Sequence, residues 1–228
     1  MAKISLADYL KERAFASGRS PDAVGPFITI SRQYGCYGFS LGLLLLEILN
    51  EEAPPEKIWK IYHREILETL ATRTNVAAEL LDLQRHEKPS YFTDFFRGLS
   101  SQRLPSTEEI RNRIATIVRG LAIQGYAIIV GQGGAGVTSD LPNGLSVRLE
   151  APEAWRVRQI AQRERISDDD AKTRILATEK QREHQRHVYE ERFPRQPAFN
   201  LVYDCSVFSL TQIAQQIVYA MKLRGITG

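Results

Sequence analysis

The chain has 228 residues, of which 43% are hydrophobic and 25% charged, and its formal net charge is +3. These values fit one globular domain, or a domain with an inserted subdomain, and exclude wholesale disorder. The longest apolar run, Leu41–Leu46, is far shorter than the ~20 residues of a membrane span. The N-terminus has no apolar signal core, and two cysteines form no disulfide framework. We therefore expect a cytoplasmic protein without a membrane partner.

The first half of the chain predicts helices and strands in alternation. Residues 4–17 carry apolar side chains at helical spacing, and a loop rich in Gly, Ser and Pro follows them. The β-branched run at 27–31 predicts a strand, from which a glycine-bearing turn leads into an apolar helix at 41–50. Beyond Pro54 and Pro55 we expect a short strand at 58–62 and short helices at 63–73 and 76–85.

The second half continues the alternation with stronger signals. Ser106 and Glu109 have the spacing of a capping box and open an amphipathic helix that Gly125 ends. Strands are expected at 126–130, 145–149 and 200–205, and helices at 151–165, 167–191 and 209–223. Strands that alternate with helices predict an α/β fold, with a mainly parallel sheet covered on both faces.

The whole excess of positive charge lies between Arg156 and Arg195. This segment holds nine Arg and two Lys against eight acidic residues, which leaves the net +3 of the chain. Arginine is suited to two-pronged contacts with phosphate. From composition alone, a solvated helix surface with ion pairs is the better explanation.

The segment between the first predicted strand and helix has the context of an anion-binding turn. There, backbone N–H groups at a helix N-terminus can hold a phosphate. Aligned with the phosphate loop G-x-x-x-x-G-K-[ST], Gly38 takes the second glycine and Ser40 the position facing Mg²⁺. Gln33 and Phe39 replace the first glycine and the lysine. A variant phosphate loop and a simple turn whose glycines allow positive φ both remain open.

Three further features are weaker on their own. The glycine cluster at 131–136 follows a predicted strand, where α/β proteins bind ligands, although alone it is better explained as a flexible crossover. Cys36 has no His or Asp near it in sequence, which favours a small turn residue over a reactive thiol. His184 and His187 lack a third ligand, which favours a solvated helix over a metal site.

Four segments together resemble the cytidylate kinase-like family, a branch of the nucleoside monophosphate kinases. ITISRQYGCYGFS is similar to the family's first strand and variant phosphate loop, ISRE(F/Y)GSGGR, and AIIVGQGGAG to its strand and GRGA turn. LSVRLEAPEAWRVRQIAQRE is similar to the VRL-x-AP segment. EKQREHQRHVYEERF, followed by NLVYDCSVFSLTQIAQQIVYAM, resembles the lid helix, last strand and last helix. The similarity runs from about Phe27 to Gly225.

The resemblance implies a fold and a domain organisation. The expected fold is α/β, a P-loop NTPase-like three-layer sandwich around a five-stranded parallel sheet. A kinase-like domain at 27–228 would follow an N-terminal helical extension at 1–26. That domain would contain a helical insert for the nucleoside monophosphate at about 60–105 and a helical lid at about 165–195.

The resemblance also implies a reaction and its residues. The γ-phosphoryl group of ATP would pass to (d)CMP or a related acceptor with Mg²⁺, which requires alignment and charge neutralisation. Arg182 and Arg186, four apart on one helix face, would be the catalytic lid arginines. Ser40 would face the metal. The nucleotide-binding residues would be Arg32, Gly35, Cys36, Tyr37, Gly38, Phe39, Ser40, Gln132 and Arg156.

The chain departs from the family pattern along the phosphate path. Phe39 stands where relatives usually carry a basic residue, Tyr37 replaces a glycine, and Gln132 replaces the Arg of the GR turn. Loss of such cations lowers a rate by orders of magnitude. An active phosphotransferase and a catalytically defective nucleotide-binding module that regulates or scaffolds a protein partner both remain open. A nucleic-acid-binding role is disfavoured, because eight acids interrupt the basic segment.

Overall fold

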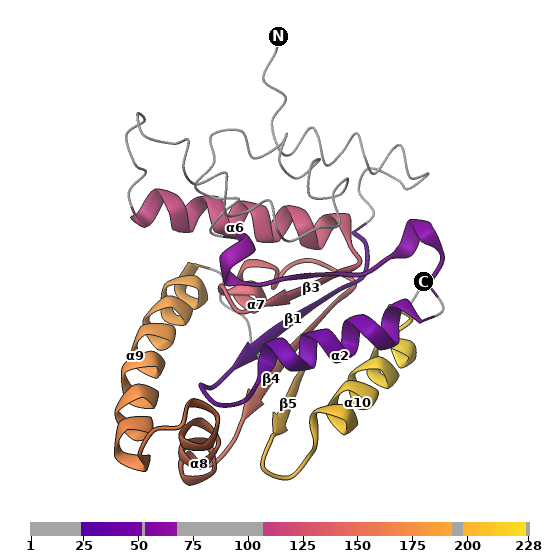
Figure 1. Ribbon diagram of the computed structural model, residues 1–228. Coiled ribbons are helices and arrows are strands. Elements are labelled where there is room, and N and C mark those ends of the chain that lie inside the picture. The colour runs from indigo at the N-terminus through magenta and orange to yellow at the C-terminus, as the bar shows by residue number, and fades with distance from the viewer. Residues whose placement is uncertain (1–23, 52, 68–106, 193–197, 227–228) are drawn as a thin grey trace, which may run out of the picture.

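A computed structural model describes residues 24–51, 53–67, 107–192 and 198–226 (Figure 1). Side chains at 107–110, 181 and 184–192 lie outside this description. The predicted helices at 4–17 and 76–85 also lie outside it, as do most of the expected insert at 60–105 and the end of the expected lid. Of the predicted helix at 63–73, residues 64–67 are described and helical.

The centre of the fold is a five-stranded, fully parallel sheet, which confirms the predicted α/β class. The strands follow the order β2-β3-β1-β4-β5, with β1 in the middle. Its strands are β1 (Phe27–Arg32), β2 (Lys60–Tyr62), β3 (Ala127–Val130), β4 (Gly144–Glu150) and β5 (Leu201–Asp204). β1 and β3 are almost wholly buried, as expected for strands with helices on both faces.

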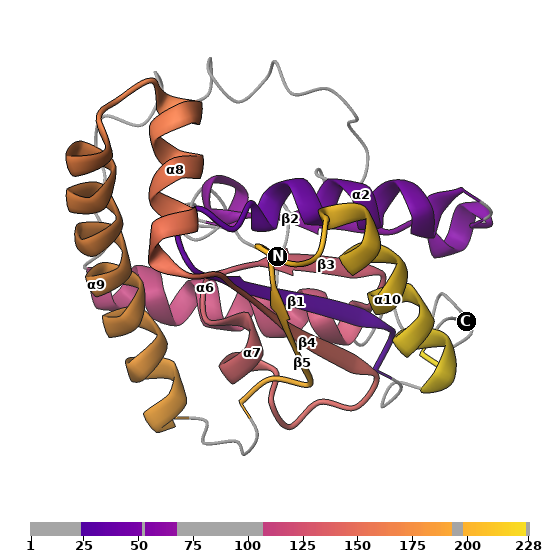
Figure 2. The ribbon, with the colours of Figure 1, turned by 90° about the horizontal axis from the view of Figure 1, so that it is seen from below.

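Helices cover the two faces of the sheet and make three layers (Figures 1 and 2). Ile28 and Ile30 of β1 join a core with α2 (Gly38–Asn50) and α10 (Leu210–Leu223). Phe27 and Ile129 join a second core on the opposite face, with α6 (Thr107–Gln124) and α7 (Gly134–Val137). A short 3-10 helix, Pro55–Lys57, precedes β2.

Two helices form a separate pair at the carboxyl edge of the sheet. α8 (Glu153–Glu164) and α9 (Asp168–Arg192) lie side by side and share a small apolar cluster of Ile160, Ala171 and Ile175 (Figure 2). Ser167 Oγ accepts a hydrogen bond from the Asp170 N–H (3.1 Å) and so caps α9, in agreement with the predicted helix start. α9 also contacts α7, so it lies next to the ends of the central strands.

Candidate functional site

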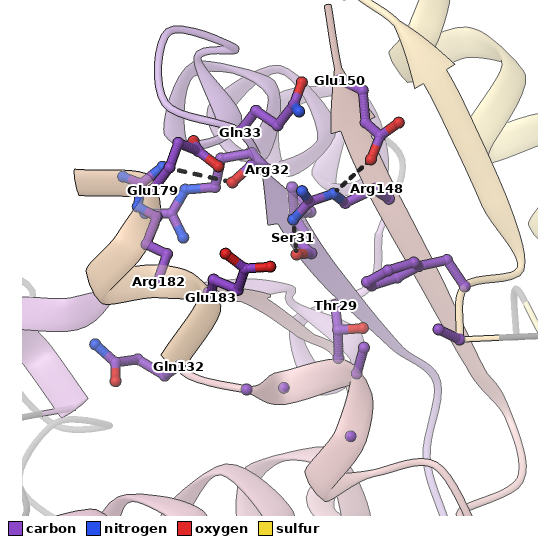
Figure 3. Close-up of a pocket in the computed structure, with 18 of the residues that line it drawn as sticks. Thr29, Ser31, Arg32, Gln33, Gln132, Arg148, Glu150, Glu179, Arg182 and Glu183 are labelled. Atoms are coloured by element: carbon purple, nitrogen blue, oxygen red, sulfur yellow. Dashed lines mark hydrogen bonds and ion pairs between the residues drawn. The ribbon is translucent and has the colours of Figure 1, made fainter. Parts of the chain in front are cut away.

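A cavity of about 400 Å³ opens at the carboxyl ends of β1, β3 and β4 (Figure 3). Its walls come from α9 and from the glycine turn after β3. Among the predicted site residues, Arg32, Gln132 and Arg182 line it. Carboxyl ends of neighbouring parallel strands are where α/β proteins bind their ligands.

The floor of the cavity is polar, because alternate residues of β1 and β4 face it. Ser31 and Arg148 are partners in the strand register, so their side chains lie on one face. Arg148 donates from Nη1 to Ser31 Oγ (2.9 Å) and from Nε to Glu150 Oε1 (3.1 Å). Its guanidinium lies 5.8 Å from the ring centroid of Phe199, and the residue is only 9% exposed. Arg148 therefore presents a positioned positive charge to the cavity.

Positive charge is concentrated around the cavity by Arg32, Arg148 and Arg182. Burial, with the charges of Arg182 and Arg148, lowers the pKa of Arg32 to about 10. Burial also lowers the pKa of Arg182, with a further contribution from Arg148 that Glu179 opposes. Among the described residues that line the cavity, four arginines face three glutamates. Cations held close together in a partly desolvated space favour an anionic ligand.

The side chain of Arg32 lies between the glycine loop that leads from β1 into α2 and the glycine turn that follows β3. A Cβ on Gly38 would meet Arg32 Cδ at 3.0 Å, and one on Gly131 would overlap its guanidinium. Gly131 has φ 81°, Gln132 φ 56° and Gly133 φ 67°, so three consecutive residues of this turn have positive φ. Glycine at positions 38 and 131 gives Arg32 its room beside the cavity.

Arg156 of α8 packs against the first glycine loop, residues 33–37 between β1 and α2. Gly35 has φ 98°, and a Cβ there would lie 3.1 Å from Arg156 Cβ. Arg156 is 6% exposed and donates from Nε to Ala151 O (3.1 Å) and from Nη1 to Tyr34 O (3.4 Å). The structure thus places Arg156 against the loop and not among the residues that line the cavity.

Glu179 of α9 places a carboxylate at the start of the same loop. Its Oε1 accepts a hydrogen bond from the Tyr34 N–H and lies 3.7 Å from Arg156 Nη1. The guanidinium of Arg182 lies 5.3 Å from the ring centroid of Tyr34. These contacts hold α9 against the loop. A phosphate oxygen that approached the same N–H would compete with Glu179.

The other predicted loop residues lie outside the cavity lining. Tyr37, in the left-handed conformation at φ 39°, donates from its hydroxyl to Gln159 Oε1 (3.1 Å). Phe39 is 42% exposed and packs edge-on against His63, with 4.9 Å between the ring centroids. Ser40 is exposed in the first turn of α2. Arg186 belongs to α9, but its side chain is outside the described part of the chain.

Cys36 is fully buried in the loop and has a partner that its sequence position does not reveal. Its thiol is in hydrogen-bond contact with that of Cys205, which follows β5. This contact and burial raise the pKa of Cys36. Both cysteines are free thiols. Burial makes a reactive nucleophile an unsuitable role for Cys36.

Sequence patterns do not single out three of the cavity residues. Arg148 lies in the predicted strand at 145–149, eight residues before the basic segment that begins at Arg156, and no motif distinguishes it. Thr29 is a buried β-branched residue of a central strand, which is ordinary core composition. Glu179 meets Tyr34 across 145 positions, for which a single sequence holds no signal.

Neither a membrane-spanning helix nor a metal cluster is found in the described part of the chain. No helix there has the length and apolar content to cross a membrane. No group of three or more His, Cys, Asp or Glu side chains there could hold a metal ion. His184 and His187 have side chains outside the description.

The parallel sheet, the glycine loop between β1 and α2, and the arginine-lined cavity define a P-loop kinase-like α/β protein. A solved structure of an uncharacterized protein from Eubacterium ventriosum shares this fold, with a TM-score of 0.62 and 17% identity. The match covers 86% of this chain and 98% of that one. TT1252 from Thermus thermophilus matches over the same shares, with 14% identity and a TM-score of 0.42.

The chain belongs to the cytidylate kinase-like family, whose family model matches residues 27–207. The resemblance noted in the sequence is therefore confirmed. No curated protein matches the chain.

Proposed function

We propose that the chain is a nucleoside monophosphate kinase-like phosphotransferase, which moves the γ-phosphoryl group of ATP to (d)CMP or a related acceptor. The observation that carries this proposal is the group of Arg32, Arg148 and Arg182 around one cavity. Phosphoryl transfer depends on positioning and on neutralising charge spread over phosphate oxygens, which is what clustered arginines supply. Arg186 would join them from the next turn of α9.

α9 would act as the lid of this site. It brings Arg182 to the cavity and reaches the first glycine loop through Glu179. Closure of such a helix excludes water and limits transfer of the phosphoryl group to solvent. In this proposal, residues 27–228 form the kinase-like domain, with an insert at about 60–105, a lid at about 165–195 and an N-terminal extension at 1–26. The proposed location of the protein is the cytoplasm, where ATP and nucleoside monophosphates are available.

Backbone amides from Gly35 to Ser40 would hold the donor phosphates at the start of α2. Mg²⁺ would arrive with ATP and neutralise phosphate charge during transfer. The Ser40 hydroxyl is exposed in the first turn of α2 and is suitable as one ligand. With no cluster of metal-binding side chains among the described residues, the ATP phosphates would hold most of the ion, as is common for Mg²⁺.

The test is the formation of nucleoside diphosphate from Mg-ATP and each nucleoside monophosphate, measured by chromatography. Arg182→Met should lower kcat/KM by roughly 100-fold or more, because it removes a charge-assisted contact to the transferring group. Arg119→Met is the matched control, since Arg119 pairs with Asp140 (2.6 Å) outside the cavity. No diphosphate above background with any acceptor would refute an active kinase.

A catalytically defective nucleotide-binding module is the second candidate. Two observations favour it: Phe39 and Gln132 stand at expected cation positions, and the Glu179 carboxylate accepts the Tyr34 N–H. This candidate predicts nucleotide binding by calorimetry without turnover. Phe39→Lys separates the two, because a large gain of activity would identify Phe39 as the disabling residue. We expect little gain, since Phe39 packs on His63 and not in the cavity.

A further inference from the structure

One buried hydroxyl on the cavity floor has no hydrogen-bond partner. Thr29 Oγ1, in the middle of β1, lacks a partner among the described residues, and the residue is 1% exposed. Its neighbours differ in this respect: Ser31 Oγ accepts from Arg148, and Ser146 Oγ bonds to Asn200 Oδ1 (2.9 Å). A buried polar group without a partner is unfavourable and rare in native proteins, so it requires an explanation.

The orientation of Thr29 is set by the helix that covers it. A Cβ on Gly134, at the start of α7, would lie 3.3 Å from Thr29 Cγ2, so the methyl group packs on that side. The hydroxyl is left on the side of β4, where Thr29 lines the cavity (Figure 3). Oγ1 itself has less than 1 Å² of accessible surface, so a ligand in the cavity meets it only with a shift of the groups that cover it.

The position of Thr29 along β1 indicates which part of a ligand it meets. The arginine group lies at the end of the strand, where Ser31 pairs with Arg148 and Arg32 follows. Thr29 lies two residues before Ser31, about 7 Å deeper along the strand. A nucleotide that places its phosphate at the arginines and extends inward along β1 would bring its uncharged part nearest to Thr29.

We propose that Thr29 is a specificity-determining residue whose hydroxyl hydrogen-bonds a polar atom of the nucleoside part of the bound nucleotide. This rests on the proposed function, because it requires that the cavity bind a nucleotide. The free protein then holds an unsatisfied hydroxyl that the correct ligand satisfies. A ligand without a polar atom at that place leaves the hydroxyl buried and unpaired, which disfavours its binding.

The test compares Thr29→Val with a matched threonine elsewhere. Valine has nearly the shape of threonine and removes only the hydroxyl. We expect the Kd for CMP to rise roughly 3- to 10-fold, the effect of one neutral hydrogen bond. The Kd for inorganic pyrophosphate should stay within about twofold, because its contacts are to the arginines. Thr29→Ser, which keeps the hydroxyl, should retain most of the CMP affinity.

Thermal unfolding gives a second readout that does not depend on any ligand. Thr29→Val should leave the Tm unchanged or raise it, because the hydroxyl is unpaired in the free protein. Thr138→Val is the control: Thr138 is also buried, at 4% exposure, but its Oγ1 donates to Gly134 O (2.8 Å). It should lower the Tm and leave CMP affinity unchanged, since Thr138 does not line the cavity.

Each other outcome overturns a stated step. If the wild type binds CMP and Thr29→Val binds it equally well, the inference fails and the proposed function stands. If the wild type binds neither CMP nor pyrophosphate, the proposed function fails and the inference with it. A Tm decrease equal to that of Thr138→Val would show that the Thr29 hydroxyl has a partner in the free protein. Equal decreases in affinity for CMP and pyrophosphate would refute its contact with the nucleoside.

Discussion

Replacement of Arg32 by methionine should stabilise the protein and weaken its binding of phosphates. The pKa of Arg32 is lowered from its ordinary value to about 10, mainly by burial and then by Arg182 and Arg148. At about 1.36 kcal/mol per pKa unit, this depression disfavours the charged side chain in the folded protein by ~3 kcal/mol. Methionine keeps most of the packing against Gly38 and removes the charge. Methionine also forms none of the hydrogen bonds of a guanidinium, so we expect the free energy of unfolding to rise by only about 1–2 kcal/mol.

The sign of this effect can be checked by its pH dependence. The folded-state pKa of about 10 lies below the ordinary pKa of arginine, so the destabilisation is complete below about pH 10. The destabilisation disappears as the pH rises above about 10 toward the ordinary pKa of arginine, because the folded protein releases the proton first. The difference in unfolding free energy between Arg32→Met and the wild type should therefore shrink above pH 10.

Urea denaturation at pH 8 and calorimetry with pyrophosphate are the assays. Arg158→Met is the control, because Arg158 is exposed on α8, and its unfolding free energy should change by less than about 0.5 kcal/mol. Pyrophosphate should bind Arg32→Met at least about tenfold more weakly, the effect of removing one charge-assisted contact. The reasoning is refuted if Arg32→Met is destabilised by more than ~1 kcal/mol while pyrophosphate binding is unchanged.

Three further predictions follow from the loop and its contacts. Gly131→Ala should destabilise the protein by at least ~1 kcal/mol more than Gly225→Ala in urea denaturation, because both have positive φ but only the first overlaps an arginine. Cys36 and Cys205 should resist alkylation by iodoacetamide in the native protein and react after unfolding, as mass spectrometry would show; rapid native labelling would contradict their burial. Glu179→Gln should bind pyrophosphate roughly 3- to 10-fold more tightly in calorimetry, because a competing negative charge is removed from the Tyr34 N–H; weaker binding would show that the carboxylate positions the loop instead.

The fold was predictable because local patterns and the overall topology agree in this chain. The β-branched run at 27–31 became β1, Phe27–Arg32, and the capping-box helix became α6. The start of α2 was placed three residues too late, since Gly38, Phe39 and Ser40 have no helical pattern of their own. The strand expected at 58–62 begins only at Lys60, because the backbone N–H and C=O of Trp59 bond to the Asn50 side chain. Boundaries depend on such distant contacts, which periodicity does not contain.

The site was less predictable, because its residues are assembled from distant segments. Arg182 and Arg32 were found through the resemblance, and both line the cavity. The position of Arg148 at the cavity follows from its pairing with Ser31 in neighbouring strands. Only the folded sheet defines this register. Arg156 was expected either to touch the nucleotide or to pack, and in the structure it donates to the carbonyl of Tyr34 and supports the loop. Charge count located the basic helix, but it could not separate arginines that face the cavity from those that support it.

The arrangement of cations also bears on the residues that replace the expected ones at Phe39 and Gln132. A cation at these positions would come from the first turn of α2 or from the turn after β3. Arg148 instead comes from the sheet, where hydrogen bonds to Ser31 and Glu150 hold its guanidinium. A charge held in place by hydrogen bonds needs less reorganisation when a phosphate arrives than a lysine on a flexible stem. Burial, together with repulsion from Arg182 and Arg148, lowers the pKa of Arg32, and the same conditions favour the binding of a phosphate while they destabilise the free protein. We therefore expect that the loss of Arg148 impairs phosphate binding more than any change at Phe39. Phe39 packs on His63 and does not line the cavity with the arginines.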